Sequence, residues 1–422
     1  MSDKKNVPKI RFPGFTEPWE QRKLGELVKE GILEAPLDGN HGEKHPTSDE
    51  YVDSGIPFLM ASDIHNGEVN IYSCKYITKE RAERLDKGFA RNGDVLLTHK
   101  ATIGETAILS NLMTEYAMLT PQVTYYRIKN EERLNREYLY SFFNSLDFQT
   151  ELKTKAAQST RPYIGITAQQ NLKIILPAEI DEQIRIGLYF RNLDHLITLH
   201  QRKLEHVKKM KKSMLQKMFP KKNQLYPEVR FPGFTDAWEQ RKLPEFVSFF
   251  NGLTYTPDDV QETGTLVLRS SNVKNGEIVD ADNVYVSDEV VTSENVKEGD
   301  IIVVVRNGSR ALIGKHAQIK ASMPNTVIGA FMSGIRSEHS SFVNALLDTS
   351  AFENEIAKNM GATINQITGY MFSKMEFMIP SGEEQDKIGA YFKQLDHLIT
   401  LHQRELDHLQ LLKKGMLQQM FI

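Results

Sequence analysis

The chain has 422 residues, of which 40% are hydrophobic and 25% charged, and its net charge is −3. These values are ordinary for a soluble protein, and the length predicts more than one domain, since a domain commonly holds about 100–200 residues. The single cysteine, Cys74, excludes a disulfide within the chain and fits a reducing compartment. No apolar run approaches the ~20 residues that span a membrane, and the charged N-terminus does not resemble a signal peptide, so a cytoplasmic location is expected.

The charge is unevenly divided along the chain. Residues 25–181 hold 17 Lys and Arg against 23 Asp and Glu, and residues 244–383 hold 10 against 18. The intervening residues 182–243 hold 14 against 6. The overall charge therefore neither supports nor excludes binding to DNA, and any DNA-facing surface on the two acidic blocks must be a local patch.

Two kinds of segment occur twice. The lead-in reads PKIRFPGFTEPWEQRKL at 8–24 and PEVRFPGFTDAWEQRKL at 227–243, with Trp19 and Trp238 at matching positions. Its aromatic residues are expected to form a hydrophobic lid on a neighbouring element. The second repeat covers 182–219 and 384–421 and contains the identical run LDHLITLHQR. Repetition of this kind defines the architecture as lead-in, variable block, constant helix, and then the same again.

The variable blocks, 25–181 (head 1) and 244–383 (head 2), share a weaker pattern. Each contains an apolar strand followed by an Asn-Gly pair, at Asn66 and at Asn275, which predicts a tight hairpin. In each, Gly-Asp then opens an apolar strand, at 95–97 and at 301–305, before a polar loop that ends in Ile-Gly.

Helical apolar spacing follows at 134–156 and at 340–360, and a second polar loop lies at 156–167 and at 361–368. The sequence therefore predicts two α/β (α+β) heads of one fold.

The repeated helix carries a heptad seam. Its apolar positions alternate in steps of four and three and contain no internal proline, so about 37 residues would form a rod of ~55 Å. The predicted seam consists of Leu193, Ile197, His200, Leu204, Val207 and Met214, and of Leu395, Ile399, His402, Leu406, Leu409 and Met416. Lys211 and Lys413 interrupt the two seams at the same depth. A metal site formed by His200 and His402 is the less favoured alternative to histidines satisfied within the seam.

The predicted domains are 1–181, 182–219, 220–383 and 384–422. The duplication indicates a pseudo-twofold molecule in which the two long helices form an antiparallel coiled coil. A parallel arrangement of the two helices is the alternative. The antiparallel arrangement is favoured because two head-and-helix units related by a twofold axis share one self-matching interface.

These features resemble the specificity subunit of a type I restriction-modification system, in a staphylococcal-like form. The resemblance covers nearly the whole chain and rests on the order of heads and helices, the RFPGF lead-ins, the LDHLITLHQR helices and the Gly-Asp strand pattern. It implies that each head is a target recognition domain that reads half of a split DNA site. It also implies that the coiled coil sets the unread gap and docks two adenine-methyltransferase subunits, and that a motor-nuclease subunit joins for restriction. No cofactor is expected on this chain, whereas S-adenosylmethionine, ATP and Mg are expected on the partner subunits.

The polar loops are the candidate DNA-binding segments, because base edges are read by polar side chains while phosphate contacts set position. The candidates are Thr98, Lys100, Thr102, Thr160, Arg161 and Tyr163 in head 1, and Arg306, Asn307, Arg310, Thr363, Asn365 and Gln366 in head 2. The alternative is that these loops are ordinary solvated turns. The basic run 208–212 could be a phosphate contact, a docking face or a solvated helix end. The second long helix is much less basic at the matching positions, which favours the solvated helix end.

The sequence argues against catalysis by this chain. It lacks the Asp/Asn-Pro-Pro-aromatic motif of adenine methyltransferases, a Walker loop of correct spacing and a Cys/His metal cluster. The sequence therefore predicts a DNA-reading adaptor without catalytic or metal residues. A stand-alone nuclease or modification enzyme and a coiled-coil scaffold that does not bind DNA are the alternatives.

Overall fold

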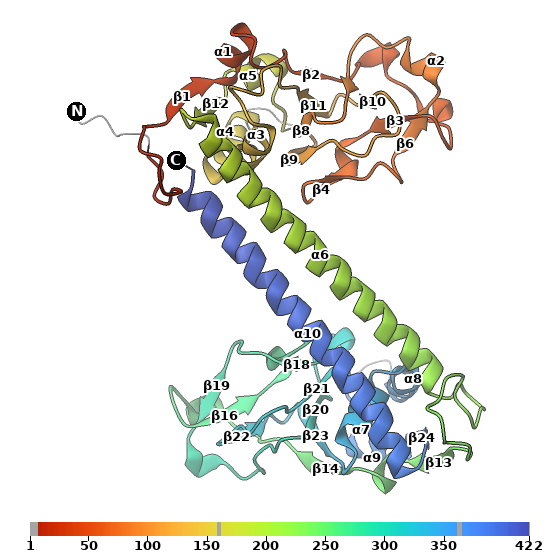
Figure 1. Ribbon diagram of the computed structural model, residues 1–422. Coiled ribbons are helices and arrows are strands. Elements are labelled where there is room, and N and C mark those ends of the chain that lie inside the picture. The colour runs from red at the N-terminus through yellow and green to blue at the C-terminus, as the bar shows by residue number, and fades with distance from the viewer. Residues whose placement is uncertain (1–6, 158–161, 361–364, 422) are drawn as a thin grey trace. The chain divides into compact units, whose positions relative to one another are not determined.

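A computed structural model describes residues 7–157, 162–360 and 365–421 (Figure 1). The chain divides into two compact units, residues 1–201 with 404–422 (unit 1) and residues 202–403 (unit 2). Each unit contains one head and one half of each of the two long helices, α6 (Ile180–Met218) and α10 (Gly382–Gln419).

Head 1 is built from small sheets that lie beside a helical layer. Its strands are β2 (Leu37–Asp38), β3 (Ile56–Leu59), β4 (Ile64–His65), β5 (Glu68–Val69), β6 (Lys75–Ile77), β7 (Phe89–Ala90), β8 (Val95–Lys100), β9 (Thr102–Ile108), β10 (Ala117–Leu119) and β11 (Val123–Tyr126). The four-stranded sheets have the orders β2-β11-β8-β9 and β6-β3-β10-β7. Strand β8 lies between β11 and β9 and is buried except at Lys100, so it forms the centre of the sheet.

The helices of head 1 pack against its two sheets, and most of them also share a core with the long helices. They are α1 (Leu24–Lys29), α2 (Lys79–Ala82), α3 (Arg136–Phe143), α4 (Leu146–Ala156) and α5 (Ile166–Gln170). Helical spacing was expected over 134–156, and the structure breaks that stretch in two. Asn144 ends α3, and the Ser145 hydroxyl accepts a hydrogen bond from the N–H of Phe148 at the start of α4. Periodicity does not detect such a break, because the apolar residues on its two sides enter one core.

Head 2 repeats the pattern with different residues. Its strands are β14 (Ser248–Asn251), β15 (Val260–Gln261), β16 (Thr265–Leu268), β17 (Val273–Lys274), β18 (Glu277–Ile278), β19 (Val284–Val286), β20 (Ile301–Val304), β21 (His316–Gln318), β22 (Thr326–Ile328) and β23 (Met332–Arg336). The order β14-β23-β20-β21 matches β2-β11-β8-β9 of head 1, and β19-β16-β22 matches β6-β3-β10, whereas the fourth strand of that sheet is β15 beside β19 in head 2 and β7 beside β10 in head 1. The helices are α7 (Ser340–Leu347), α8 (Ser350–Asn359) and α9 (Gly369–Lys374), and Thr349 caps α8 at the equivalent break. The prediction of two α/β heads with one fold is confirmed.

The predicted Asn-Gly hairpins are confirmed in each head. Asn66 (φ 53°) and Gly67 (φ 80°) join β4 to β5, and Asn275 (φ 54°) and Gly276 (φ 76°) join β17 to β18. Positive φ at two successive central residues is the geometry that Asn-Gly adopts most easily.

Within each unit, the start of one long helix packs against the end of the other, which is the predicted antiparallel arrangement. In unit 1, Leu409, Met416 and Phe421 from the end of the chain join a core that contains Phe190 and Leu193 from the first turns of α6. In unit 2, the end of α6 enters a core with the start of α10, through Val207, Met214, Met218, Phe392 and Leu395. All twelve predicted seam side chains are buried or half-buried. The antiparallel prediction is therefore confirmed, and the parallel alternative is excluded.

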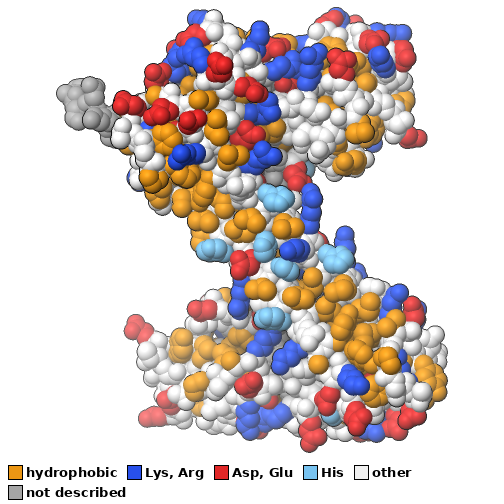
Figure 2. Space-filling view, in the orientation of Figure 1, with side chains coloured by type: hydrophobic (Ala, Val, Ile, Leu, Met, Phe, Trp, Pro, Cys, Tyr) orange, Lys and Arg blue, Asp and Glu red, His pale blue; other side chains and the backbone are white. Residues whose placement is uncertain are grey.

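Leucines outside the seam face solvent, with exposed fractions of 40% for Leu196 and 37% for Leu199 on α6, and 38% for Leu398 and 42% for Leu401 on α10. Figure 2 shows apolar and histidine side chains on the surface of these helices. No helix among the described residues is long and apolar enough to cross a membrane.

The four-part division at 181, 219 and 383 stays a prediction. The long helices begin and end within a few residues of those boundaries, but the compact units divide inside the helices.

Candidate nucleic-acid interface

In head 1, two loops that are far apart in the sequence meet at the end of strand β8. Ala101 (φ 68°) turns the chain directly from β8 into β9, so the polar loop expected after residue 97 is instead a strand end and a tight turn. Lys100 is paired across a β-bridge with Tyr163 from the second loop, and its ammonium lies 5.9 Å from the centre of the Tyr163 ring. Lys100, Thr102 and Tyr163 are exposed and form one small surface.

Thr98 and His99 lie beneath this surface. The Thr98 side chain is fully buried, and its hydroxyl accepts a hydrogen bond from the N–H of Glu105 at 3.0 Å, so it supports the hairpin instead of facing solvent. His99 Nδ1 donates to the carbonyl of Ile164 at 3.0 Å, and the N–H of Ile164 donates to the His99 carbonyl. These bonds hold the second loop against the end of β8.

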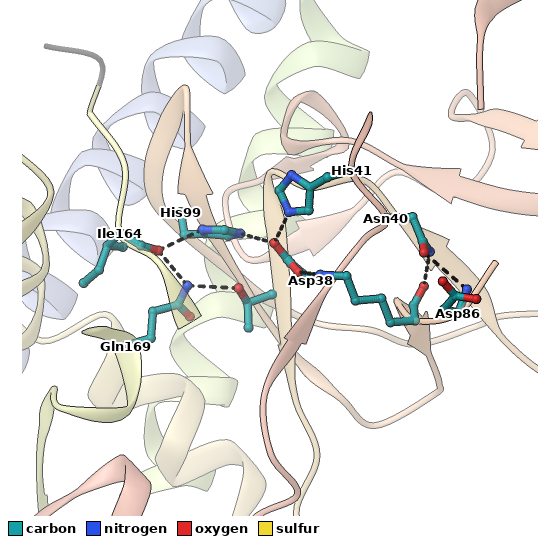
Figure 3. A network of polar contacts seen from close by, with 9 residues as sticks. Asp38, Asn40, His41, Asp86, His99, Ile164 and Gln169 are labelled. Carbon is teal, nitrogen blue, oxygen red and sulfur yellow. Dashed lines mark hydrogen bonds and ion pairs between the residues drawn. The ribbon is translucent and has the colours of Figure 1, made fainter. Parts of the chain in front are cut away.

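A buried polar network extends from His99 on its two sides (Figure 3). On one side, Gln169 donates to the carbonyl of Ile164 at 3.0 Å and to the Thr124 hydroxyl at 3.1 Å. On the other side, His99 Nε2 faces the Asp38 carboxylate at 3.9 Å. Burial lowers the pKa of His99 to about 4 against the opposing attraction of Asp38, so the ring is neutral at pH 7.

Asp38 is the charged centre of this network. It is buried, and it pairs with Lys87 and with His41 Nε2 at 2.9 Å. Burial raises the pKa of Asp38, but the hydrogen bonds from Lys87 and His41 outweigh burial and lower it. Asn40 extends the cluster by donating to the Lys87 carbonyl and accepting from the N–H of Asp86. The carboxylate is thus held charged beneath the hairpin surface.

Head 2 brings its two predicted loops together in the same way. Arg306 forms a β-bridge with Gln366, and the N–H of Ile367 donates to the Val305 carbonyl at 2.8 Å. By these bonds Arg306 corresponds to Lys100, Gln366 to Tyr163 and Val305 to His99. The Arg306 guanidinium lies 5.0 Å from the centre of the exposed Phe331 ring.

The first loop of head 2 is open where that of head 1 is a tight hairpin. It contains a single helical turn at Arg310–Leu312 before strand β21 begins. Asn365 Nδ2 donates to the Gly308 carbonyl at 3.1 Å, and Asn307 Nδ2 donates to the Ser270 hydroxyl at 3.0 Å. Arg306 and Arg310 are exposed, whereas Asn307, Asn365 and Gln366 are half-buried. Thr160, Arg161 and Thr363 lie outside the described residues.

The duplicated lead-in fastens each head to the start of a long helix. In unit 1, Arg11 forms two bonds of 2.6 and 2.8 Å to the fully buried Glu182 carboxylate, and Trp19 Nε1 donates to it at 3.2 Å. In unit 2, Arg230 binds the buried Glu384 in the same way at 2.7 and 2.8 Å. The lead-in also adds a strand, with β1 (Glu20–Lys23) paired to β12 (Lys173–Leu176) and β13 (Glu239–Lys242) paired to β24 (Glu376–Ile379).

Two structural features were missed in the sequence, namely a close-packed glycine in each long helix and the Asp38–His99 network of head 1. Gly187 and Gly389 lie inside long helices, and a Cβ at either position would lie 2.7 Å from a backbone nitrogen, that of Tyr138 or that of Phe342. A glycine repeated inside an otherwise regular helix was the available signal. The Asp38–His99 network had no local signal, because its members come from distant strands.

The arrangement of heads and helices defines a class of protein, and comparison with known sequences agrees. Residues 16–209 and 235–411 match the type I restriction modification DNA specificity domain, so the chain belongs to this family. It is the DNA specificity subunit of a type I restriction-modification system, which is the non-catalytic component of such an enzyme.

Particular relatives match half of the chain or nearly all of it. The type I restriction enzyme MjaVIII specificity subunit of Methanocaldococcus jannaschii is 22% identical over 97% of this chain and 93% of its own length. The EcoBI specificity subunit of Escherichia coli is 24% identical over 50% of this chain and 42% of its own length. The fold is similar to that of a type I S subunit from M. genitalium, with a TM-score of 0.68, 14% identity and 99% of each chain covered. The expected staphylococcal likeness finds no support among these relatives.

Proposed function

We propose that each head reads one half of an asymmetric, bipartite DNA site. The observation that carries the proposal is the shared placement of the two loops. Each head presents a side chain from the end of its central strand beside one from its second loop, as Lys100 with Tyr163 and as Arg306 with Gln366. The same position with different side chains suits two readers of different sequences.

The chemistry of the two surfaces suggests different modes of contact. Arg306 and Arg310 can each bind a guanine edge through two hydrogen bonds, and Asn307, Asn365 and Gln366 have the amides that suit adenine. Lys100 is a point charge suited to phosphate, and Tyr163 offers an aromatic face. Thr98 is left out of the contact set because it is buried. Thr102, Thr160, Arg161 and Thr363 remain in it on the sequence alone.

The long helices would act as the spacer between the half-sites. With 39 and 38 residues, α6 and α10 correspond to ~55–60 Å of continuous helix. Half-sites on one face of the duplex recur every ~34 Å, so a spacer of this length can separate readers by more than one turn.

The same helices would dock two methyltransferase subunits. The identical run LDHLITLHQR leaves His195, Leu196 and Leu199 exposed on α6, and His397, Leu398 and Leu401 exposed on α10. One surface presented twice suits two copies of one partner. A motor-nuclease subunit would join through that complex, with S-adenosylmethionine, ATP and Mg bound by the partner subunits.

A head exchange tests the proposal. The chain is mixed with its methyltransferase partner, and methylated adenines are mapped before and after residues 25–181 are replaced by the equivalent block of a relative. One half-site should change while the other half and the gap stay the same.

The chain alone, given Mg, ATP and methyl donor, serves as the control and should neither cut nor methylate DNA. Simultaneous change of the two half-sites would contradict two independent readers. Activity of the chain alone would favour the stand-alone enzyme, and failure to confer binding to any split sequence would favour the scaffold.

A further inference from the structure

In each unit, a lysine of one long helix pairs with an aspartate of the other. Lys211 Nζ on α6 lies 2.5 Å from Asp396 Oδ1 on α10 in unit 2, and Lys413 Nζ on α10 lies 2.5 Å from Asp194 Oδ1 on α6 in unit 1. The lysine follows the aspartate by 17 residues on each helix. Because opposite charges at equal spacing face each other in one antiparallel register, these pairs favour that register over a shifted one.

Each Lys–Asp pair also binds the head of its own unit, through a different member of the pair. In unit 1 the Tyr140 hydroxyl, from α3, donates to Asp194 Oδ2 at 3.1 Å. In unit 2 the Asp348 carboxylate, at the end of α7, lies 2.5 Å from Lys211 Nζ. The helix pair is thus constant, whereas the group that reaches it from the head varies with the head.

The two junctions are partly shielded from solvent, with side-chain exposed fractions of 30% for Asp348, 22% for Asp396 and 21% for both Lys413 and Asp194. The exposed fraction is 16% for the Lys211 side chain and 7% for Tyr140. Burial alone would lower the pKa of Lys211, but Asp348 and Asp396 outweigh burial and raise it, so the ammonium is charged at neutral pH. In unit 1, a Cβ on Gly67 at the tip of the β4–β5 hairpin would lie 2.3 Å from the Tyr140 hydroxyl oxygen, so the hairpin packs directly on this group.

A shielded junction of this kind tolerates few arrangements. An ammonium or carboxylate that loses its partner while shielded costs free energy, so a tilt of the head that separates these groups is penalised. Apolar packing alone would not penalise a small tilt as steeply, because apolar contacts are non-directional.

We propose that Lys211 and Lys413, with Asp396 and Asp194, are positioning residues that fix the angle at which each head is held on the long helices. Asp348 and Tyr140 are the head-side contacts through which a given head fits this frame. The consequence for DNA, that the angle sets the length of gap accepted between half-sites, rests on the proposed function above.

The angle is tested without DNA by double electron–electron resonance on the full chain, which measures the distance between two spin labels. Cys74 is the only cysteine, so a Cys74→Ala background accepts spin labels at Glu289→Cys on head 2 and at Lys209→Cys on α6, two exposed positions of unit 2. Lys211→Met should broaden or shift the distance distribution. Lys212→Met, the same change at the neighbouring exposed lysine, is the matched control and should leave the distribution as in the parent chain.

If Lys211→Met abolishes folding, Asp348→Asn decides the question, because it removes the head-side charge and keeps the pair between the helices. A folded Lys211→Met or Asp348→Asn variant with the parent distribution would overturn the proposal.

A second measurement reports on DNA. With the methyltransferase partner present, binding is compared for sites whose gap is lengthened or shortened by one base pair. Lys211→Met should reduce the preference for the native gap by about tenfold and leave the preferred bases of each half-site unchanged. A parent chain that binds no split site would contradict the proposed function, and the spin-label distances would still decide whether the lysine positions the head.

Discussion

Head 1 and head 2 share a fold and a frame but differ where their two loops meet. In head 1 a tight turn at Ala101 joins β8 directly to β9, and the buried His99 lies just before the turn. In head 2 an open loop follows β20, and Val305 occupies the position of His99. The junctions with the long helices are more alike, since three features occur in each unit: the pairing of a lead-in arginine with a buried glutamate (the Arg–Glu clasp, Arg11–Glu182 and Arg230–Glu384), the close-packed glycine and the Lys–Asp pair. The heads therefore differ most at the end of the central strand, whereas the attachment of the head keeps these three features and differs in the head-side group that meets the Lys–Asp pair, Tyr140 or Asp348.

The Arg–Glu clasp should give the largest effect on stability, and a difference between the heads. Removing one partner of a buried ion pair costs about 3–5 kcal/mol, so Glu182→Gln and Glu384→Gln should each destabilise the unit that contains it. Glu182→Gln should cost more, because Trp19 Nε1 also donates to Glu182. Urea unfolding followed by hydrogen exchange of peptides from each head measures the two effects separately.

The exposed pair between Arg241 and Glu239 provides the control for the clasp. Glu239→Gln should change the free energy of unfolding by less than about 1 kcal/mol. Equal losses for Glu182→Gln and Glu239→Gln would mean that the clasp does not hold the head.

The long helices and the hairpins could be predicted from the sequence because their patterns occur twice in the chain. The repeated LDHLITLHQR run and its seam predicted the long helices, and the Asn-Gly pairs predicted the hairpins at Asn66 and Asn275. The site was less accessible. The sequence indicated the two loops of each head, but it did not show that Lys100 meets Tyr163 or that Thr98 is buried, because strand pairing between distant residues decides these positions.

A second prediction concerns acid sensitivity, which should belong to head 1. The pKa of His99 falls to about 4 on folding from an ordinary value of about 6.5. Between these values the unfolded chain binds more protons than the folded chain, so stability falls as the pH falls from about 6.5 to about 4, by up to about 3 kcal/mol.

His99→Val copies the corresponding Val305 of head 2 and should remove this contribution. Unfolding by urea at several pH values, with exchange read for head 1, measures the slope for the parent and the variant. The carboxylates of head 1 contribute to the slope in both proteins, so the informative quantity is the difference in slope between the parent and the variant. Identical slopes would show that His99 does not become protonated on unfolding.

A third prediction concerns the glycines at which a head touches its long helix. A Cβ at position 187 or 389 would lie 2.7 Å from backbone nitrogen, and backbone cannot move aside as a flexible side chain can. Gly187→Ala should destabilise head 1 and Gly389→Ala head 2, each by about 3 kcal/mol. Gly415→Ala on α10 is the control, because a Cβ there meets nothing within 4 Å and should gain up to about 1 kcal/mol from helix propensity. Loss of stability in Gly415→Ala, or none in the other two, would refute this account of the contact.

The smallest predicted effect separates the two surfaces by their chemistry. Arg306→Ala should weaken binding of the complex by about 1–3 kcal/mol and relax preference at one base pair of one half-site, because an arginine that holds a base edge distinguishes it from other bases. Lys100→Ala should weaken binding almost uniformly across sequences and reduce the dependence of affinity on salt, because a phosphate contact carries no sequence information. Affinities measured at several salt concentrations on sites substituted one base pair at a time distinguish these outcomes. A base-specific loss in Lys100→Ala would mean that head 1 reads sequence at the tip of its hairpin, as head 2 is proposed to do at Arg306.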